Sequence, residues 1–168
     1  RTLQGMSISN RTENEVSDFF GPQTGVVVTA STGASPSLAF DGNMTTFWNG
    51  GTRHCSLYFS FPEPKKVTQV QCLGGGTNTC PIYASHTGIG IDSVLIRPNT
   101  GFTSELWLDI PTPEYYQYYW MSFDSGSSTW NPGITDVRFR ITNDESGYHE
   151  NYVAISSGSI EIEDNFYV

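Results

Sequence analysis

The chain has 168 residues, of which 15% are charged and 14% aromatic, and its formal net charge is −9. This length predicts a single domain with a sizeable core, and the scarcity of Lys, Glu and Arg disfavours a helix-rich fold. Eight basic residues against seventeen acidic ones exclude a nucleic-acid partner, because affinity for phosphates comes mostly from Lys and Arg. The same balance makes a membrane partner an unfavoured alternative.

The sequence contains no run of eighteen apolar residues, so no transmembrane helix is predicted. It lacks an initiating Met and a charged-then-apolar leader, which is typical of a mature or excised fragment. Two N-glycosylation sequons, Asn10-Arg11-Thr12 and Asn43-Met44-Thr45, are typical of a secreted or cell-surface glycoprotein. We therefore expect an extracellular location.

Residues 1–23 are polar and fit no period, so they are expected to form a linker or an irregular edge segment before a domain at 24–168. Within that domain, short runs of β-branched and aromatic residues separated by turn signals predict strands. These runs are Val26–Ala30, Leu57–Phe61, Val67–Leu73, Ile91–Ile96, Glu105–Ile110, Tyr115–Phe123, Val137–Ile141, Tyr152–Ser156 and Ser159–Ile162. Strands of this length and spacing predict a sandwich or a barrel.

Alternation assigns faces to one of these strands. Because successive side chains of a strand point to opposite faces, Thr68, Val70 and Cys72 are expected to face the core. Val67, Gln69 and Gln71 are then expected to point the other way. In the same way, Arg138 and Arg140 point away from the core, where they either are solvated or line a cleft.

A loop at residues 41–46 combines oxygen-bearing side chains with a tight bend. Asp41 offers a carboxylate, Asn43 an amide or main-chain oxygen, and Thr46 a hydroxyl and a carbonyl. Calcium takes six to eight such oxygens, although Asp-Gly-Asn is also an ordinary turn sequence. The loop predicts a cation site with a plain turn as the alternative, and a glycan on Asn43 is compatible with the ion only if the main-chain oxygen faces it.

Three segments, in order, resemble the discoidin or coagulation factor 5/8 type C family, which includes galactose-binding-like carbohydrate-binding modules. They are Ala39–Trp48, which is similar to A-F-D-G-N…T…W, then Leu57–Val70, and the closing strands from Val137 to Glu163. The resemblance implies an all-β, discoidin-like jelly-roll β-sandwich of about eight antiparallel strands. Many relatives join their first and last strands by a disulfide, and the absence of terminal cysteines places this chain nearer the carbohydrate-binding modules.

The resemblance also implies a structural Ca²⁺ ion as cofactor. Its ligands are expected to be Asp41, Asn43, Thr46 and Glu161, and other registers of the last strand would substitute Glu163 or Ser159 for Glu161. In this family the ligand lies among loops at one end of the sandwich, and Trp48 is expected to be buried as a brace for the cation loop.

Sugars are bound by stacking on an aromatic ring and by planar polar groups that take paired hydroxyls. Two loops, 48–54 and 125–133, combine both kinds of side chain, and a third, weaker candidate surrounds His149. The candidate ligand-binding residues are Asn49, Arg53, His54, Trp130, Asn131 and His149. Trp130 is expected to be the exposed stacking residue.

The chain has three cysteines, so at least one is unpaired. Cys72 and Cys80 bracket a glycine-rich loop that could close, and they are the favoured disulfide pair. Three reduced thiols acting as small apolar residues are the alternative.

No catalytic motif is present: the chain lacks a GxSxG elbow, an HExxH helix and a phosphate-binding loop with its Lys. The predicted function is a non-catalytic glycan-binding module, a lectin or carbohydrate-binding module, with a glycan as partner. The alternative is a cell-adhesion or receptor module that recognises a protein or a phospholipid head group.

Overall fold

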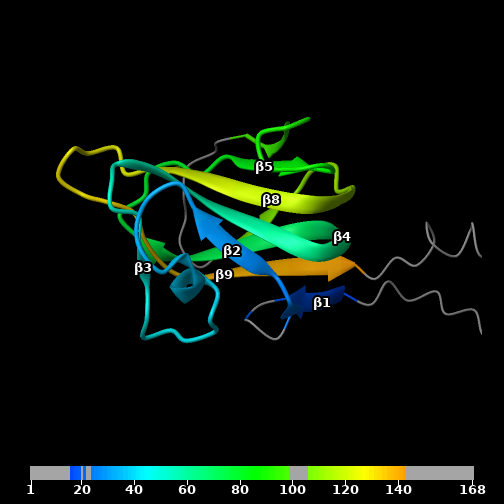
Figure 1. The fold of residues 1–168 in the computed structure, drawn as a ribbon, viewed down its shortest axis with the longest axis horizontal. Helices are drawn as coiled ribbons and strands as arrows, with labels where there is room; N and C mark the ends of the chain where they lie inside the picture. Colours follow the sequence, from blue (N-terminus) through cyan, green and yellow to red (C-terminus); the bar gives the residue numbers. More distant parts are fainter. Residues whose placement is uncertain (1–15, 20, 22–23, 99–105, 143–168) are drawn as a thin grey trace, which may run out of the picture. The chain divides into compact units, whose positions relative to one another are not determined.

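A computed structural model describes residues 16–19, 21, 24–98 and 106–142, which form an antiparallel β-sandwich (Figure 1). This described part contains nine strands and one short 3-10 helix: β1 (Val16–Phe19), β2 (Val27–Ala30), η2 (Pro36–Ala39), β3 (Trp48–Asn49), β4 (His54–Gly75), β5 (Ile82–Ser85), β6 (Val94–Arg97), β7 (Trp107–Asp109), β8 (Tyr115–Asp124) and β9 (Gly133–Thr142). The predicted all-β jelly-roll sandwich is confirmed. None of these described elements is a helix long and apolar enough to cross a membrane.

Strand β4 is shared by the two sheets of the sandwich. Its first half, His54–Ser60, lies between β2 and β8, and β5 and β6 continue that sheet beyond β8. Its second half, Val67–Gly75, lies between β7 and β9, and β1 and β3 pair with the far side of β9. One continuous strand therefore sets the position of both sheets.

The change of sheet takes place in the middle of β4. The pairing with β8 shifts between Ser60 and Lys65, where Pro62 and Pro64 have no N–H to donate to a ladder. The Tyr119 hydroxyl donates to the Lys65 carbonyl at 2.6 Å and accepts from the Val67 N–H at 3.4 Å. The sequence predicted two separate strands here, and the structure corrects this because the prolines interrupt the pairing without ending the strand.

An aromatic cluster holds the two sheets together. Phe139 of β9 contacts Phe59 and Phe61 of β4 edge-on, with ring centroids 5.0 and 5.2 Å apart. Phe40, which follows η2, adds a third edge contact to Phe139 at 6.1 Å. Edge-to-face pairs at such distances contribute to stability beyond the burial of their area.

The predicted faces of the second half of β4 are right except at Thr68 and Val67. Thr68 was expected to face the core, but it is only half-buried and its hydroxyl donates to the Arg140 carbonyl at 3.1 Å. Val70 and Cys72 are buried and Gln69 points outward, as expected. Val67 was expected to point outward, and this was wrong, because it is only 1% exposed. The reason is a register shift between Val67 and Gln69, which breaks the alternation and lets Val67 and Val70 both reach the core.

Three strands were missed by the sequence analysis. They are β1, β3 and β5, which have four residues or fewer and carry little periodic signal. Strand β1 lies within residues 1–23, where no strand was predicted, and it pairs with the end of β9. The strands predicted at Tyr152–Ser156 and Ser159–Ile162 lie outside the described residues, so the domain boundaries stay a prediction.

Replacing Phe139 by Ala should lower the free energy of unfolding by about 3–5 kcal/mol, because it removes the ring that the other aromatics contact. Chemical denaturation measures the loss. Phe47→Ala is the matched control, since that ring is 56% exposed and should contribute less than about 0.5 kcal/mol. Equal losses in the two variants would contradict the assignment of Phe139 to the core.

Candidate functional site

An open pocket of about 330 Å³ lies on the outer face of the sheet where β4 begins and β8 ends. Its lining includes the hydroxyl groups of Ser31, Ser56, Ser122 and Thr79, and two of these are joined by the Ser56–Ser122 contact of 3.0 Å. Ser56 and Ser122 are partners across the β4–β8 ladder, so the sheet itself sets their spacing. The pocket is therefore rich in small polar groups that are fixed by backbone geometry.

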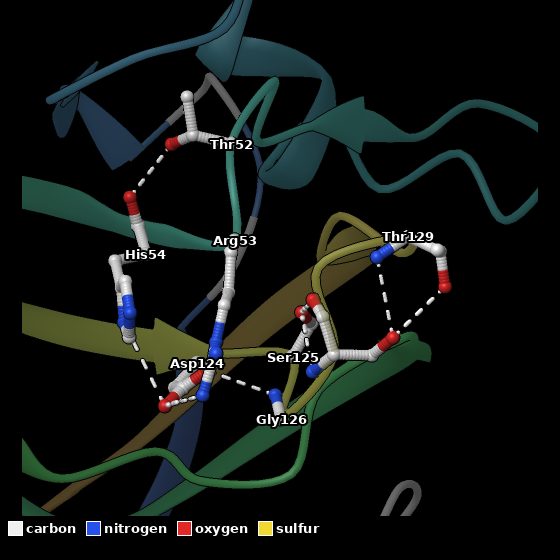
Figure 2. Close-up of polar contacts among 8 residues, drawn as sticks. Thr52, Arg53, His54, Asp124, Ser125, Gly126 and Thr129 are labelled. Carbon is white, nitrogen blue, oxygen red and sulfur yellow. Dashed lines mark hydrogen bonds and ion pairs between the residues drawn. The ribbon is translucent and has the colours of Figure 1, made fainter.

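Asp124 at the end of β8 is the centre of the polar contacts at this pocket (Figure 2). Its Oδ1 accepts from Arg53 Nε at 2.9 Å and from the Gly126 N–H at 2.8 Å. The hydrogen bond from Arg53, followed by that from Gly126, lowers the pKa of Asp124 to about 2. The carboxylate is therefore ionised at neutral pH and forms an ion pair with Arg53.

The second oxygen of Asp124 is less occupied than the first. Arg53 Nη2 and His54 Nδ1 lie 3.5 and 3.6 Å from Oδ2, at or beyond the limit of a good hydrogen bond. The Arg53 and His54 side chains are 44% and 69% exposed. A ligand hydroxyl at this position could donate to Oδ2 and accept from either neighbouring side chain.

Backbone hydrogen bonds connect the loops near the pocket, which are those around residues 50–53, 76–79 and 125–132. Gly50 N donates to Pro132 O at 2.8 Å, Asn78 N to Asp124 O at 2.7 Å, and Ser125 N to Arg53 O at 3.2 Å. The glycine at position 50 is needed, because a Cβ there would collide with the Cys55 side chain. The site is thus held by main-chain contacts and does not depend on long side chains alone.

The structure brings together some of the predicted ligand residues. Arg53 and His54 meet at Asp124, which sequence reasoning did not select. Trp130 is 69% exposed in the loop after β8, as predicted, and Asn131 beside it is also exposed. The only sequence signal for Asp124 was its place at the end of a strand, before the Ser- and Gly-rich loop. His149 lies outside the described residues.

Asn49 belongs to a different sheet from Arg53 and His54. It forms β3 with Trp48 and pairs with Gly133 of β9, and its Oδ1 accepts from the Gly51 N–H at 2.9 Å. Trp48 is fully buried, as predicted, so its strand neighbour Asn49 points to the outer side of that sheet. A role for Asn49 in ligand binding stays a prediction.

Oxygen atoms converge in the predicted cation loop. Thr46 Oγ1 lies 2.7 Å from Asp41 Oδ2 and 2.9 Å from Asn43 O, while Asp41 Oδ1 accepts from the Asn43 N–H. The Asn43 side chain is turned to Thr45, whose N–H and hydroxyl donate to it, while the Asn43 main-chain oxygen accepts from the N–H and hydroxyl of Thr46. This arrangement is compatible with both a cation and the sequon.

These oxygens fit a hard cation but fill less than the shell that calcium requires. Glu161, the predicted second carboxylate, lies outside the described residues. Within the described part of the chain, no group of three or more His, Cys, Asp or Glu side chains gathers at one place. The described residues alone would therefore offer a cation mostly neutral oxygens.

The cysteines differ from the favoured prediction. Cys55, Cys72 and Cys80 are buried thiols, so the predicted Cys72–Cys80 disulfide is not formed in this structure. Burial raises the pKa of Cys55 to about 11 and that of Cys80 to about 12, and it also raises the pKa of Cys72. Protonated, buried thiols are poor nucleophiles, and these residues act as small apolar side chains.

Protein purified without reductant should therefore show three thiols in denaturant when titrated with a thiol reagent, and almost none while folded. The folded protein should not react because the thiolate form is suppressed and the sulfurs are enclosed. A count of one thiol in denaturant would instead show that two of the cysteines form a disulfide.

No family model matches the chain, and no curated protein matches it. Among solved structures, it is similar to the family 32 carbohydrate-binding module of Clostridium perfringens NanJ in complex with galactose, with a TM-score of 0.60 and 16% identity over 74% of this chain and 99% of that one. The chain therefore shares the β-sandwich fold of that module. A chitosan-binding module from a Paenibacillus chitosanase/glucanase gives a TM-score of 0.57 at 17% identity, over 67% of this chain and 92% of that one.

A pectin-binding carbohydrate-binding module is similar to the same extent, with a TM-score of 0.58 and 16% identity over 67% of this chain and 88% of that one. Identities this low establish the shared fold and leave the ligand to be argued from the residues of this chain. The three modules bind chemically different sugars, so the fold does not select one.

Proposed function

We propose that this chain is a non-catalytic, extracellular glycan-binding module that holds a sugar in the pocket beside Arg53 and Asp124. The observation that carries the proposal is the half-satisfied Asp124 carboxylate, placed between two exposed donors and a row of hydroxyl groups. Sugar recognition needs such fixed, paired polar groups with an aromatic ring nearby. The similarity of the fold to carbohydrate-binding modules supports the same function.

Each group has a defined task in this proposal. Asp124 Oδ2 accepts from one sugar hydroxyl, and Arg53 donates to the oxygen of that hydroxyl or of its neighbour. Trp130, with 69% of its surface exposed, offers a ring for stacking against the apolar face of the sugar. Because Arg53 and Asp124 neutralise each other, the pocket suits an uncharged sugar better than a uronate or an amino sugar.

Arg53→Ala should weaken glycan binding by roughly 10- to 100-fold, because a charge-assisted hydrogen bond is lost and Asp124 is released from its position. Isothermal titration with the best sugar from a glycan array measures the change. The melting temperature should stay close to that of the wild type, since the ion pair is solvent-exposed. Unchanged affinity would remove Arg53 from the site.

Trp130→Ala should abolish detectable glycan binding and leave the melting temperature unchanged, because the ring contributes to stacking and not to the core. Phe47→Ala is the matched control: it removes an exposed aromatic ring that lies in the loop before β3, and Phe47 does not line the pocket. Binding that survives in Trp130→Ala, or that is lost equally in Phe47→Ala, would refute this role.

One observation favours the alternative, a module for a phospholipid head group. Met44, Phe47 and Trp130 expose 52%, 56% and 69% of their surfaces on loops, as membrane-inserting side chains do. The net charge of −9 opposes binding to anionic lipids. Sedimentation with phosphatidylserine vesicles, together with a blank glycan array, would shift the proposal to this function.

We also propose that a structural Ca²⁺ ion is held by Asp41, the main-chain oxygen of Asn43 and Thr46, with Glu161 as the further ligand implied by the family resemblance. Support comes from the converging oxygens of the loop. When bound, the ion supplies charge compensation and fixes the loop, and it takes no part in chemistry.

A chelator should lower the melting temperature by several degrees, because an ion that binds only the folded chain stabilises it by mass action. Differential scanning calorimetry with calcium and with EDTA measures the shift, and Asp41→Asn should remove most of it. A wild-type melting temperature that is the same in both buffers would refute the calcium site.

A further inference from the structure

Asp136 of β9 is a buried carboxylate with one oxygen left without a partner. The residue is fully buried, and Arg138 Nε donates to its Oδ2 at 2.9 Å. Oδ1 is buried and has no hydrogen-bond partner. The other such atoms among the described residues, in Trp48, Thr77 and Thr142, belong to neutral groups. A carboxylate oxygen without a partner is the costliest of these atoms to bury.

The segment that carries the predicted cation loop contacts β9 on both sides of this residue. At its start, the Phe40 ring packs on Phe139, and at its end Trp48 pairs with Ile134. In the middle, Arg138 Nη2 lies 3.5 Å from Met44 Sδ. Residues 40–48 therefore follow β9 from position 139 to position 134, and Asp136 lies within the stretch that they cover.

The face of β9 on which Asp136 lies is consistent with this placement. Val137 and Phe139 are fully buried in the core, so Asp136 and Arg138 alternate to the outer side of the sheet. A residue on the outer side is fully buried only when something covers it, and the Met44–Arg138 contact brings the 41–46 loop to the neighbouring residue of that face. The oxygen without a partner thus lies on the side of β9 that this oxygen-rich loop approaches.

We propose that Asp136 supplies a carboxylate oxygen to a divalent cation, Ca²⁺ in the first instance, which is held between β9 and the loop carrying Asp41, Asn43 and Thr46. The inference rests on the proposed calcium site and adds a ligand that neither the loop motif nor the family resemblance contains. The formal charges of Asp41, Asp136 and Arg138 sum to −1, so the ion enters a site of opposite sign.

This ligand changes what the ion does in the fold. A cation bound by the loop alone would stiffen only the turn at residues 41–46. A cation that also binds Asp136 links the loop to β9, whose first residues pair with β3 and β4. It also gives the shell a second carboxylate from within the described residues, independent of Glu161.

The test compares calcium binding by the wild type, Asp136→Asn, Asp41→Asn and a control variant, Asp109→Asn. Asp109 is also an acidic residue on the same sheet, but it is exposed and accepts from Gln69, away from the loop. Isothermal titration with CaCl₂ on metal-free protein gives the dissociation constants, and near-ultraviolet circular dichroism shows that each variant is folded. We expect Asp136→Asn to weaken calcium binding by about tenfold or more, and Asp109→Asn to leave it unchanged.

The outcomes separate this inference from the site on which it rests. If Asp41→Asn abolishes binding and Asp136→Asn binds like the wild type, the calcium site stands and Asp136 is not a ligand. If the wild type binds no calcium, both proposals fail, whereas the glycan pocket is tested on its own. Should Asp136→Asn fail to fold, crystals of the wild type grown with calcium decide: an anomalous peak about 2.3–2.6 Å from Asp136 Oδ1 supports the ligand, and its absence there overturns it.

Discussion

The continuity of β4 is the constraint on which the rest of this structure depends. The strand runs from His54 to Gly75, and each half belongs to a different sheet. Its first residue therefore lies at the proposed glycan pocket, while its last residues pair with β9, which also contacts the predicted cation loop. The bend between the halves is fixed by the Tyr119 hydroxyl, which bonds to Lys65 on one side and Val67 on the other. Burial raises the pKa of Tyr119, so this bond donor stays protonated.

The pocket is prepared before any ligand arrives. Its carboxylate is oriented by Arg53 and by a main-chain N–H, and its loops are joined to one another by backbone hydrogen bonds. Preorganisation of this kind reduces the conformational entropy that is lost on binding. This reduction would matter for a sugar ligand, because its hydroxyl groups exchange hydrogen bonds with water for similar ones with the protein and gain little free energy. An open pocket of about 330 Å³ is at the small end of ligand sites, a size suited to one sugar ring.

The fold class could be predicted from the sequence because it depends on local patterns of residues. The contacts of the candidate site depend on the tertiary fold and could be predicted only in part. The β-class followed from composition and short apolar runs. Arg53, His54 and Trp130 could be selected as candidates because each stands in a recognisable loop pattern, and the burial of Trp48 could be predicted from the family resemblance. Asp124 and Asp136 were not selected from the sequence, because the roles proposed for them depend on neighbours that are distant in the sequence. The Val67 face was wrong because a register shift cannot be seen in an alternating pattern. The three-cysteine count permitted a disulfide, but only the fold shows where the three sulfurs are buried.

The two proposed sites are adjacent along the chain, so a change at the cation loop can affect the sugar pocket. After Thr46 the chain forms β3, turns at Gly50, and reaches Arg53 within one short loop. Gly50 is bonded to Pro132, next to Gly133, with which Asn49 pairs. A cation that fixes residues 41–46 on β9 therefore also fixes one end of the segment that positions Arg53. Sugar affinity should then depend on the ion through the placement of Arg53 alone, even though no ion ligand contacts the sugar, and the dependence should disappear in Arg53→Ala.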